Sequence, residues 1–222
     1  MDVRAEILRV ATRLFATRGF DGTSLQSIAE EVGIRKPSLL YHFASKEQLR
    51  LAVLDELLAR WSDVLPRLLM AAAGGEPRFA TVMREAVGFF AEDPDRARLL
   101  VREILDRPDD MRVRLDKYVR PWVDIVADYI RRGQESGEVH ELVDPEAYVL
   151  QIINLVVSGV AAAASLQGGL LPADSERGDP TQRHARELVR IARYSLFRAP
   201  EEGEEARPPA RRTRSELRAN EE

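Results

Sequence analysis

The sequence predicts an all-α protein. Apolar residues recur at the three- and four-residue spacing of amphipathic helices, as in the stripe formed by Ile7, Ala11, Leu14 and Phe15. The alternation of apolar and polar residues at period two, which is typical of strands, is nearly absent. Residues that cap helices also stand immediately before several of these apolar stripes. Together these observations favour a chain built from consecutive helices.

The helices can be bounded from their start and stop signals. Gly19 ends the first one, because glycine accepts the left-handed conformation that closes a helix. Four starts are predicted from capping pairs, which are Thr23 with Gln26, Ser45 with Gln48, Asp93 before Pro94, and Asp144 before Pro145. Pro66 and Pro121 are expected to kink or split the long helices that contain them. The expected helices are 2–18, 24–31, 35–42, 45–72, 77–92, 94–106, 109–135, 145–167 and 180–198.

The composition is that of an ordinary soluble protein. The chain has 222 residues, of which 45% are hydrophobic and 32% charged, so it can bury a sizeable core. There is no cysteine, which excludes disulfides, thiolate zinc sites and cysteine nucleophiles and agrees with a cytoplasmic location. Met1 is followed by a charged segment, so no signal peptide is expected. The longest apolar run, "INLVVSGVAAAASL", is short for a membrane span and is predicted to be a buried helix.

The second and third helices are too short to be stable alone. Isolated helices below about 12 residues are marginal in water, so 24–31 and 35–42 must be held by packing. Leu25 and Ile28 provide an apolar stripe on one, and Leu39 provides part of the stripe on the other. Gly33 stands between them, where a positive φ allows a sharp turn. With the first helix they form a three-helix unit containing a helix-turn-helix, whose second helix can enter the major groove of DNA.

The outward side of that second helix carries groups that suit DNA. Arg35 and Lys36 supply charge for phosphates or guanine edges, and Ser38 and Tyr41 supply hydroxyls for phosphate oxygens. Pro37 offers an apolar face to a thymine methyl. The charge pattern agrees mildly, since residues 1–50 hold eight basic and six acidic residues while the whole chain carries −4.

The flanks of the same helix add four further candidates. His42 can donate to phosphate, and Lys46 stands at a helix start where free N–H groups also favour an anion. Ser24 and Gln26 begin the preceding helix, which in such motifs crosses the DNA backbone. The alternatives are a packing role for Tyr41, hydrogen bonding at the helix end for His42, a cap for Ser24, and solvated charges for Lys36 and Lys46.

Residues 7–49, "ILRVATRLFATRGFDGTSLQSIAEEVGIRKPSLLYHFASKEQL", resemble the DNA-binding domain of the tetracycline-repressor (TetR) family of bacterial transcription regulators. The resemblance implies DNA contacts from Gln26, Arg35, Lys36, Pro37, Ser38, Tyr41, His42 and Lys46. One position departs from the family pattern. Leu40 stands where the family usually has tyrosine, so a phosphate contact is not carried over to it.

The remaining helices are more than a DNA-reading unit needs for support. The resemblance implies that they bind a small molecule and form a homodimer. The helix from Pro145 is apolar on nearly every side, and small residues near Gly159 leave room for another helix. The predicted dimer interface comprises Ile152, Leu155, Val156, Gly159, Val160, Leu188, Ile191 and Phe197. The alternative is burial of the same residues within one chain.

Aromatic and methionine side chains between Trp61 and Tyr129 predict an apolar pocket with a few polar groups. The candidate lining is Phe79, Met83, Phe90, Arg102, Glu103, Tyr118, Trp122 and Asn154. Glu103 has an alternative role in a structural ion pair or cap. The composition permits a hydrophobic or amphipathic organic effector, and no cofactor is expected.

The domains expected are a helix-turn-helix domain over 1–50, a helical regulatory and dimerisation domain over 51–198, and a disordered charged tail over 199–222. The Arg-rich part of that tail either touches DNA phosphates or is simply solvated. The predicted function is a dimeric regulator that binds a near-palindromic double-stranded DNA operator, most simply a repressor released by its effector, with an activator as the other sign.

Other classes of function have less support. No catalytic residues and no metal ligands are predicted, because the motifs of metalloenzymes, phosphate loops and serine hydrolases are missing. A membrane role is not expected either. A helical protein-interaction scaffold is the alternative function, and specific, salt-dependent DNA binding would distinguish the regulator from it.

Overall fold

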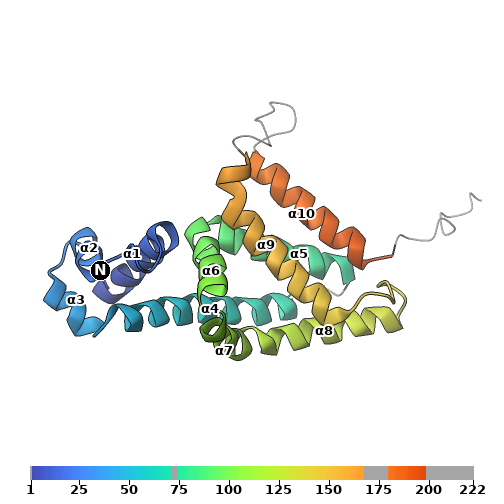
Figure 1. Cartoon of the computed structure of the whole chain (residues 1–222). Coiled ribbons are helices and arrows are strands. Elements are labelled where there is room, and N and C mark those ends of the chain that lie inside the picture. The colour runs from blue at the N-terminus through green and yellow to red at the C-terminus, as the bar shows by residue number, and fades with distance from the viewer. Residues whose placement is uncertain (1, 72–74, 168–179, 199–222) are drawn as a thin grey trace, which may run out of the picture.

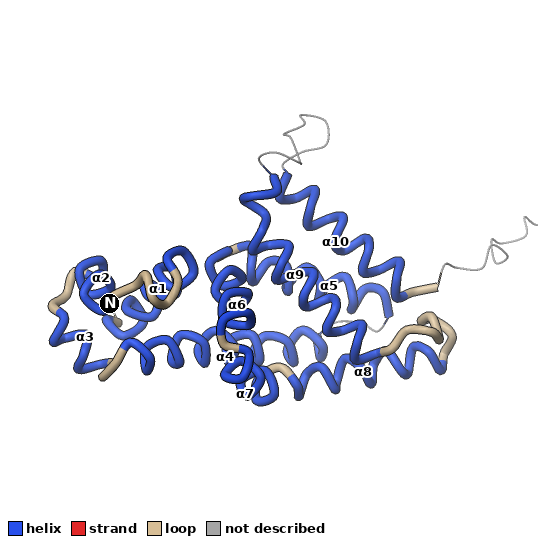
Figure 2. The backbone as a smooth tube through the Cα atoms, in the orientation of Figure 1, coloured by secondary structure: helices blue, strands red, loops and turns tan. Residues whose placement is uncertain are grey.

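The computed structural model describes residues 2–71, 75–167 and 180–198, and within these ranges the protein is built from helices without a β-strand. The helices are α1 (Val3–Arg18), α2 (Leu25–Val32), α3 (Lys36–His42), α4 (Lys46–Ala71), α5 (Gly75–Ala91), α6 (Pro94–Asp106), α7 (Pro108–Tyr118), α8 (Arg120–Glu135), α9 (Pro145–Gln167) and α10 (Pro180–Leu196). The all-α prediction is confirmed (Figure 2). The predicted charged tail over 199–222 lies outside the described residues.

Most predicted boundaries agree with the structure to within two residues. The two long predicted helices that contain a proline differ from each other, because one is split and the other is continuous. The predicted helix 109–135 is two helices, α7 and α8, which meet at Val119. Pro121 lies at the start of α8, where its missing N–H leaves no hydrogen bond unmade. By contrast, α4 continues through Pro66 as one helix.

One predicted helix cap is wrong. Thr23 does not cap α2, because its side chain is buried and its hydroxyl donates to the carbonyls of Leu14 and Gly19. Ser24 is the N-cap, and it forms a capping box with Ser27. The other predicted caps are confirmed, since Ser45, Asp93 and Asp144 each accept a hydrogen bond from the backbone of the first helical turn.

Helices α1 to α3 form a compact unit, which we call the head, at one end of the molecule (Figure 1). Its core is made by the buried side chains of Ile7, Leu14, Ile28, Leu39 and Phe43. The two short helices are therefore stabilised by packing, because α2 packs against α1 and α3 packs against α2. Gly33 closes α2 in the left-handed conformation, with φ 79° and ψ 28°, which sets the turn into α3.

The remaining helices form the larger part of the molecule, and α4 runs from the head into it (Figure 1). Helix α6 packs against both α1 and α9, so the head also touches this part away from α4. Helix α9 lies among α5, α6, α8 and α10. This arrangement places one wall of the larger part directly beside the head.

Helix α9, which the sequence predicts to be buried, is not covered on all sides within the single chain. Its residues Pro145–Ala163 are, within the described ranges, long and apolar enough to span a membrane by length and composition, but only 17% of that window is buried. One face is open and carries Leu150 and Leu155, which are 56% and 36% exposed. The sequence could not distinguish burial within the chain from an apolar face left for another surface.

Candidate nucleic-acid interface and ligand cavity

The two sides of α3 have opposite environments. Leu39 points into the head and is fully buried, whereas Arg35, Lys36, Pro37 and Ser38 are all exposed. Tyr41, on the same outward side, is 87% exposed, which excludes a packing role for its ring within the chain. The ring is therefore accessible to a partner.

The residues that flank this face are less free. His42 is half-buried and its ring meets the edge of Tyr41 at a centroid distance of 5.5 Å. Gln26 is exposed and donates to Glu30 at 2.8 Å, while Ser24 is occupied with its capping hydrogen bonds. We refer to the exposed Arg35, Lys36, Pro37, Ser38 and Tyr41 as the reading face.

Lys46 begins α4, where the sequence predicts that it contacts a DNA phosphate, but its side chain is held within the protein. Its ammonium is turned inward and donates to the carbonyls of Phe20 and Thr23 at 2.8 and 2.9 Å. It also lies over the Phe20 ring, 4.2 Å from the centroid. These contacts use two of its three N–H donors to join the start of α4 to the α1–α2 turn.

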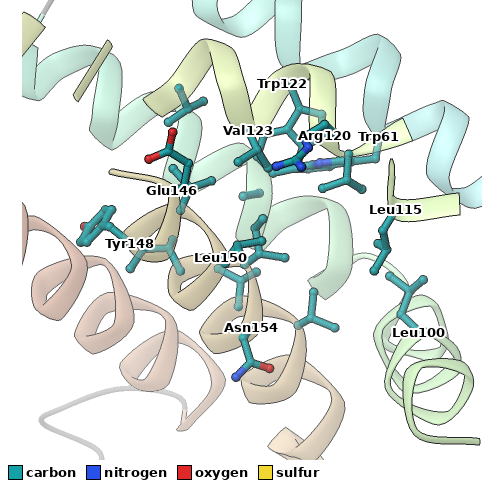
Figure 3. A pocket seen from close by; sticks show the side chains of 18 of the residues that line it. Trp61, Leu100, Leu115, Arg120, Trp122, Val123, Glu146, Tyr148, Leu150 and Asn154 are labelled. Atoms are coloured by element: carbon teal, nitrogen blue, oxygen red, sulfur yellow. The ribbon is translucent and has the colours of Figure 1, made fainter. Parts of the chain in front are cut away.

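A cavity of about 770 Å³ lies in the larger part of the molecule. Five of the predicted residues line it, namely Phe79, Met83, Phe90, Trp122 and Asn154. Trp61 contributes to the same wall and packs against Phe89, Phe90 and Trp122 with ring centroids 5.2 to 6.0 Å apart. Figure 3 shows Trp61 and Trp122 at one end of the cavity and Asn154 at the other. Such a mostly apolar hollow is typical of small-molecule sites.

The polar groups of the cavity come from its edge. Arg112, Arg120, Glu146 and Asn154 line its exposed or half-buried parts. Trp122 is only 7% exposed, and its indole N–H has no hydrogen-bond partner in the part of the chain that the structure describes. This donor lies in the cavity wall with its nitrogen covered by neighbouring protein atoms, so it does not open onto the space that a bound molecule would fill.

Three predicted lining residues lie elsewhere. Arg102 points toward the head, where its Nε donates to the Ala16 carbonyl at 2.9 Å. Glu103 is buried in an ion pair with Arg50, which agrees with its alternative structural role. Tyr118 does not line the cavity, and its carbonyl accepts a hydrogen bond from the Ser62 hydroxyl at the α7–α8 junction. The prediction rested on residue type and not on helix face, so it included sequence neighbours of lining residues whose own side chains point elsewhere.

The comparisons with known proteins agree with the two parts of this architecture. The family model for bacterial regulatory proteins of the tetR family matches residues 7–53. A second model, for the tetracyclin repressor-like C-terminal domain, matches residues 100–171, and together the two span more than half of the chain. The protein belongs to the TetR family.

The relatives of this TetR-family chain match it over part of its length. The chain is 49% identical to the HTH-type transcriptional regulator RutR of Escherichia coli over 55 residues, which are 25% of this chain and 26% of RutR. It is 28% identical to the HTH-type transcriptional repressor AcnR of Corynebacterium diphtheriae over 143 residues, 62% of this chain and 68% of AcnR. The solved structure of AibR in complex with isovaleryl coenzyme A and operator DNA is 19% identical, with a TM-score of 0.67 over 88% of this chain and all of AibR.

The predicted dimer residues of this TetR-family chain divide into two groups. Val156, Val160, Leu188 and Phe197 are buried within the chain, and Ile152 is half-buried. Gly159 allows His184 of α10 to pack closely, because a Cβ there would come within 2.6 Å of the imidazole. Leu155 and Ile191 remain 36% and 46% exposed on α9 and α10. Only the last two are therefore available to a second copy, together with the exposed Tyr194.

The sequence did not single out Arg50, which the structure places at the centre of an ion-pair cluster. Its side chain is fully buried and bridges Glu47, Glu103 and Asp110. Burial alone would lower the pKa of Arg50, but the hydrogen bonds with Glu47 and Asp110 and the charge of Glu103 raise it above its ordinary value. The hydrogen bond from Arg50 in turn lowers the pKa of Asp110.

Replacing Lys46 by methionine is expected to destabilise the TetR-family head. Both carbonyls that accept from its ammonium would lose a charged donor, which costs about 1–3 kcal/mol of unfolding free energy. Urea unfolding of the variant measures this loss. Lys36→Met is the matched control, because Lys36 is exposed and should leave the stability unchanged. Equal stability of the two variants would contradict a structural role for Lys46.

Proposed function

We propose that this protein is a sequence-specific DNA-binding transcription regulator, and most simply a repressor that a small hydrophobic or amphipathic effector releases from its operator. The observation that carries this proposal is the reading face, where basic, hydroxyl and aromatic side chains stand exposed on the second helix of a helix-turn-helix. The name of AcnR as a transcriptional repressor supports the sign of regulation. The helical scaffold alternative does not account for an exposed Tyr41 beside Lys36.

In this proposal the two parts of the chain have different functions. Residues 1–50 read the DNA and 51–198 carry the effector and dimerisation functions. The cavity supports a ligand with an apolar body, and the polar residues at its edge, such as Arg112, Arg120 and Asn154, suit an amphipathic one. AibR, whose fold this chain shares, is solved with both an acyl coenzyme A and operator DNA. A cytoplasmic protein without a membrane role is consistent with the family.

Selection of random duplex DNA by the purified protein tests this function. A near-palindromic sequence should be enriched, and its affinity should fall steeply with salt because lysine and arginine displace counterions from phosphates. The same selection with Lys36→Ala should recover less DNA. If the protein binds DNA weakly and enriches no sequence, with or without extracts of small molecules, the scaffold would become the better explanation.

We further propose that a second copy of the chain covers the open face of α9 and the neighbouring face of α10. Leu155→Glu together with Ile191→Glu is then expected to convert a dimer into a monomer, because each substitution places a charge in the contact twice by symmetry. Sedimentation measures the mass. Leu142→Glu is the matched control, since Leu142 is 96% exposed in the turn between α8 and α9 and should leave the dimer intact. A variant that stays dimeric would place the interface elsewhere.

A further inference from the structure

Arg50 connects the helix that leaves the head with two helices of the larger part. Its Nη1 donates to Glu103 on α6, and its Nη2 donates to Asp110 on α7 at 2.6 Å. Its Nε donates to Glu47 on its own helix α4 at 2.9 Å. Because the guanidinium is planar and its donors have a fixed geometry, these contacts set the angle between α4 and the other two helices more tightly than a single ion pair would.

The partners of Arg50 are neighbours of the cavity wall. Glu103 lies on α6 between Leu100 and Ile104, which both line the cavity. Asp110 lies on α7 next to Met111, another lining residue that is 1% exposed. Each acceptor carboxylate is thus carried by a helix that also lines the cavity, while the donor is carried by the helix that leads to the head.

Further contacts hold the head against the same wall. Arg107, between α6 and α7, stacks over the Phe20 ring at 4.4 Å from its centroid, and its Nη1 lies 3.5 Å from Glu47. Phe20 is on the α1–α2 turn, and Arg102 reaches from α6 to the end of α1. These contacts surround Arg50. Of the three arginines, Arg50 is the one that is fully buried and that pairs with residues of α4, α6 and α7 together.

We propose that Arg50 is the positioning residue that holds the head at a set orientation to the wall of the cavity, so that α4, α6 and α7 move together. Its regulatory meaning rests on the proposed function: an effector that shifts α6 or α7 would act on the heads through this residue. The positioning itself is a property of the chain alone and needs neither DNA nor effector to be tested.

The distance between the head and the larger part can be measured directly. The chain contains no cysteine, so Glu30→Cys on α2 and Leu142→Cys in the α8–α9 turn give two exposed sites for spin labels. Pulsed double electron–electron resonance on the full chain, diluted with unlabelled protein, then reports the distance distribution within one chain. The labelled protein that retains Arg50 should give one narrow distance distribution.

The decisive variant is Arg50→Met combined with Glu103→Leu, which removes both buried charges and leaves Glu47 and Asp110 partly in water. A broadened or shifted distance distribution, at a melting temperature close to that of the parent protein, is the expected result. Asp110→Asn, at a half-exposed carboxylate, should broaden it less. Arg131→Met is the matched control, because Arg131 pairs with Asp128 and Glu146 away from the head. A folded double variant with the parental distribution would overturn the proposal.

The two proposals fail separately. If the double variant broadens the distribution but the parent enriches no DNA sequence, the positioning role stands and the regulator function fails. If the parent enriches a palindrome and the double variant keeps both the parental distribution and the parental affinity, the function stands and Arg50 has no positioning role. When both hold, the double variant should bind the selected operator more weakly, because heads of variable orientation must be ordered on binding.

Discussion

Tyr41→Ala is expected to weaken binding to the selected operator by roughly 10- to 150-fold without changing the melting temperature. The ring is 87% exposed and contributes little packing to the head, so its removal should leave the fold intact. A hydroxyl that donates to a charged phosphate contributes about 1.5–3 kcal/mol, which corresponds to that loss of affinity. Titration of labelled operator by fluorescence anisotropy, at one fixed salt concentration, measures the effect.

Two companion variants separate the contributions to DNA binding. Tyr41→Phe keeps the ring and removes only the hydroxyl, so it should lose most of the affinity if phosphate contact dominates and little if the ring stacks on sugar or base. Lys36→Ala should reduce the slope of log affinity against log salt by about one, because one phosphate contact is lost. An unchanged operator affinity in Tyr41→Ala would contradict the proposed position of α3 in the DNA interface.

Arg50→Met is expected to destabilise the protein by about 3–5 kcal/mol. It leaves the carboxylate of Glu103, a residue only 4% exposed, without its cation. Adding Glu103→Leu should recover most of the loss, because apolar side chains of similar size can replace a buried ion pair at little cost. Urea unfolding of both single variants and the double variant completes a mutant cycle that isolates the pair.

The competing outcome has a clear meaning. If Arg50→Met and the double variant were equally destabilised, the loss would come from the methylene packing or the contacts with Glu47 and Asp110 and not from the uncompensated charge. Arg114→Met offers a comparison, since Arg114 pairs with the half-exposed Asp55 at 3.1 Å and should cost much less.

The local sequence was sufficient for the helices and the head. Helix starts depend on residues within one turn, so Ser45, Asp93 and Asp144 could be recognised without tertiary information. The one misplaced cap shows the limit of such reasoning. Thr23 and Ser24 are equally good caps locally, and the choice was made by Thr23 donating to carbonyls of α1 in the buried turn.

Only the tertiary structure decided which long side chains serve the cavity, the head or the contact between them. Lys46 and Arg102 are solvent-accessible charges by sequence, yet they donate to backbone carbonyls of Phe20 and Ala16, because another segment brings those carbonyls within reach. Arg50 and Glu103 are 53 positions apart, and no local pattern links them. The sequence by itself therefore determined an all-helical chain whose head contains a helix-turn-helix. The packing of α4 against α6 and α7 determined how that head is held, because long-range ion pairs depend on the positions of whole helices.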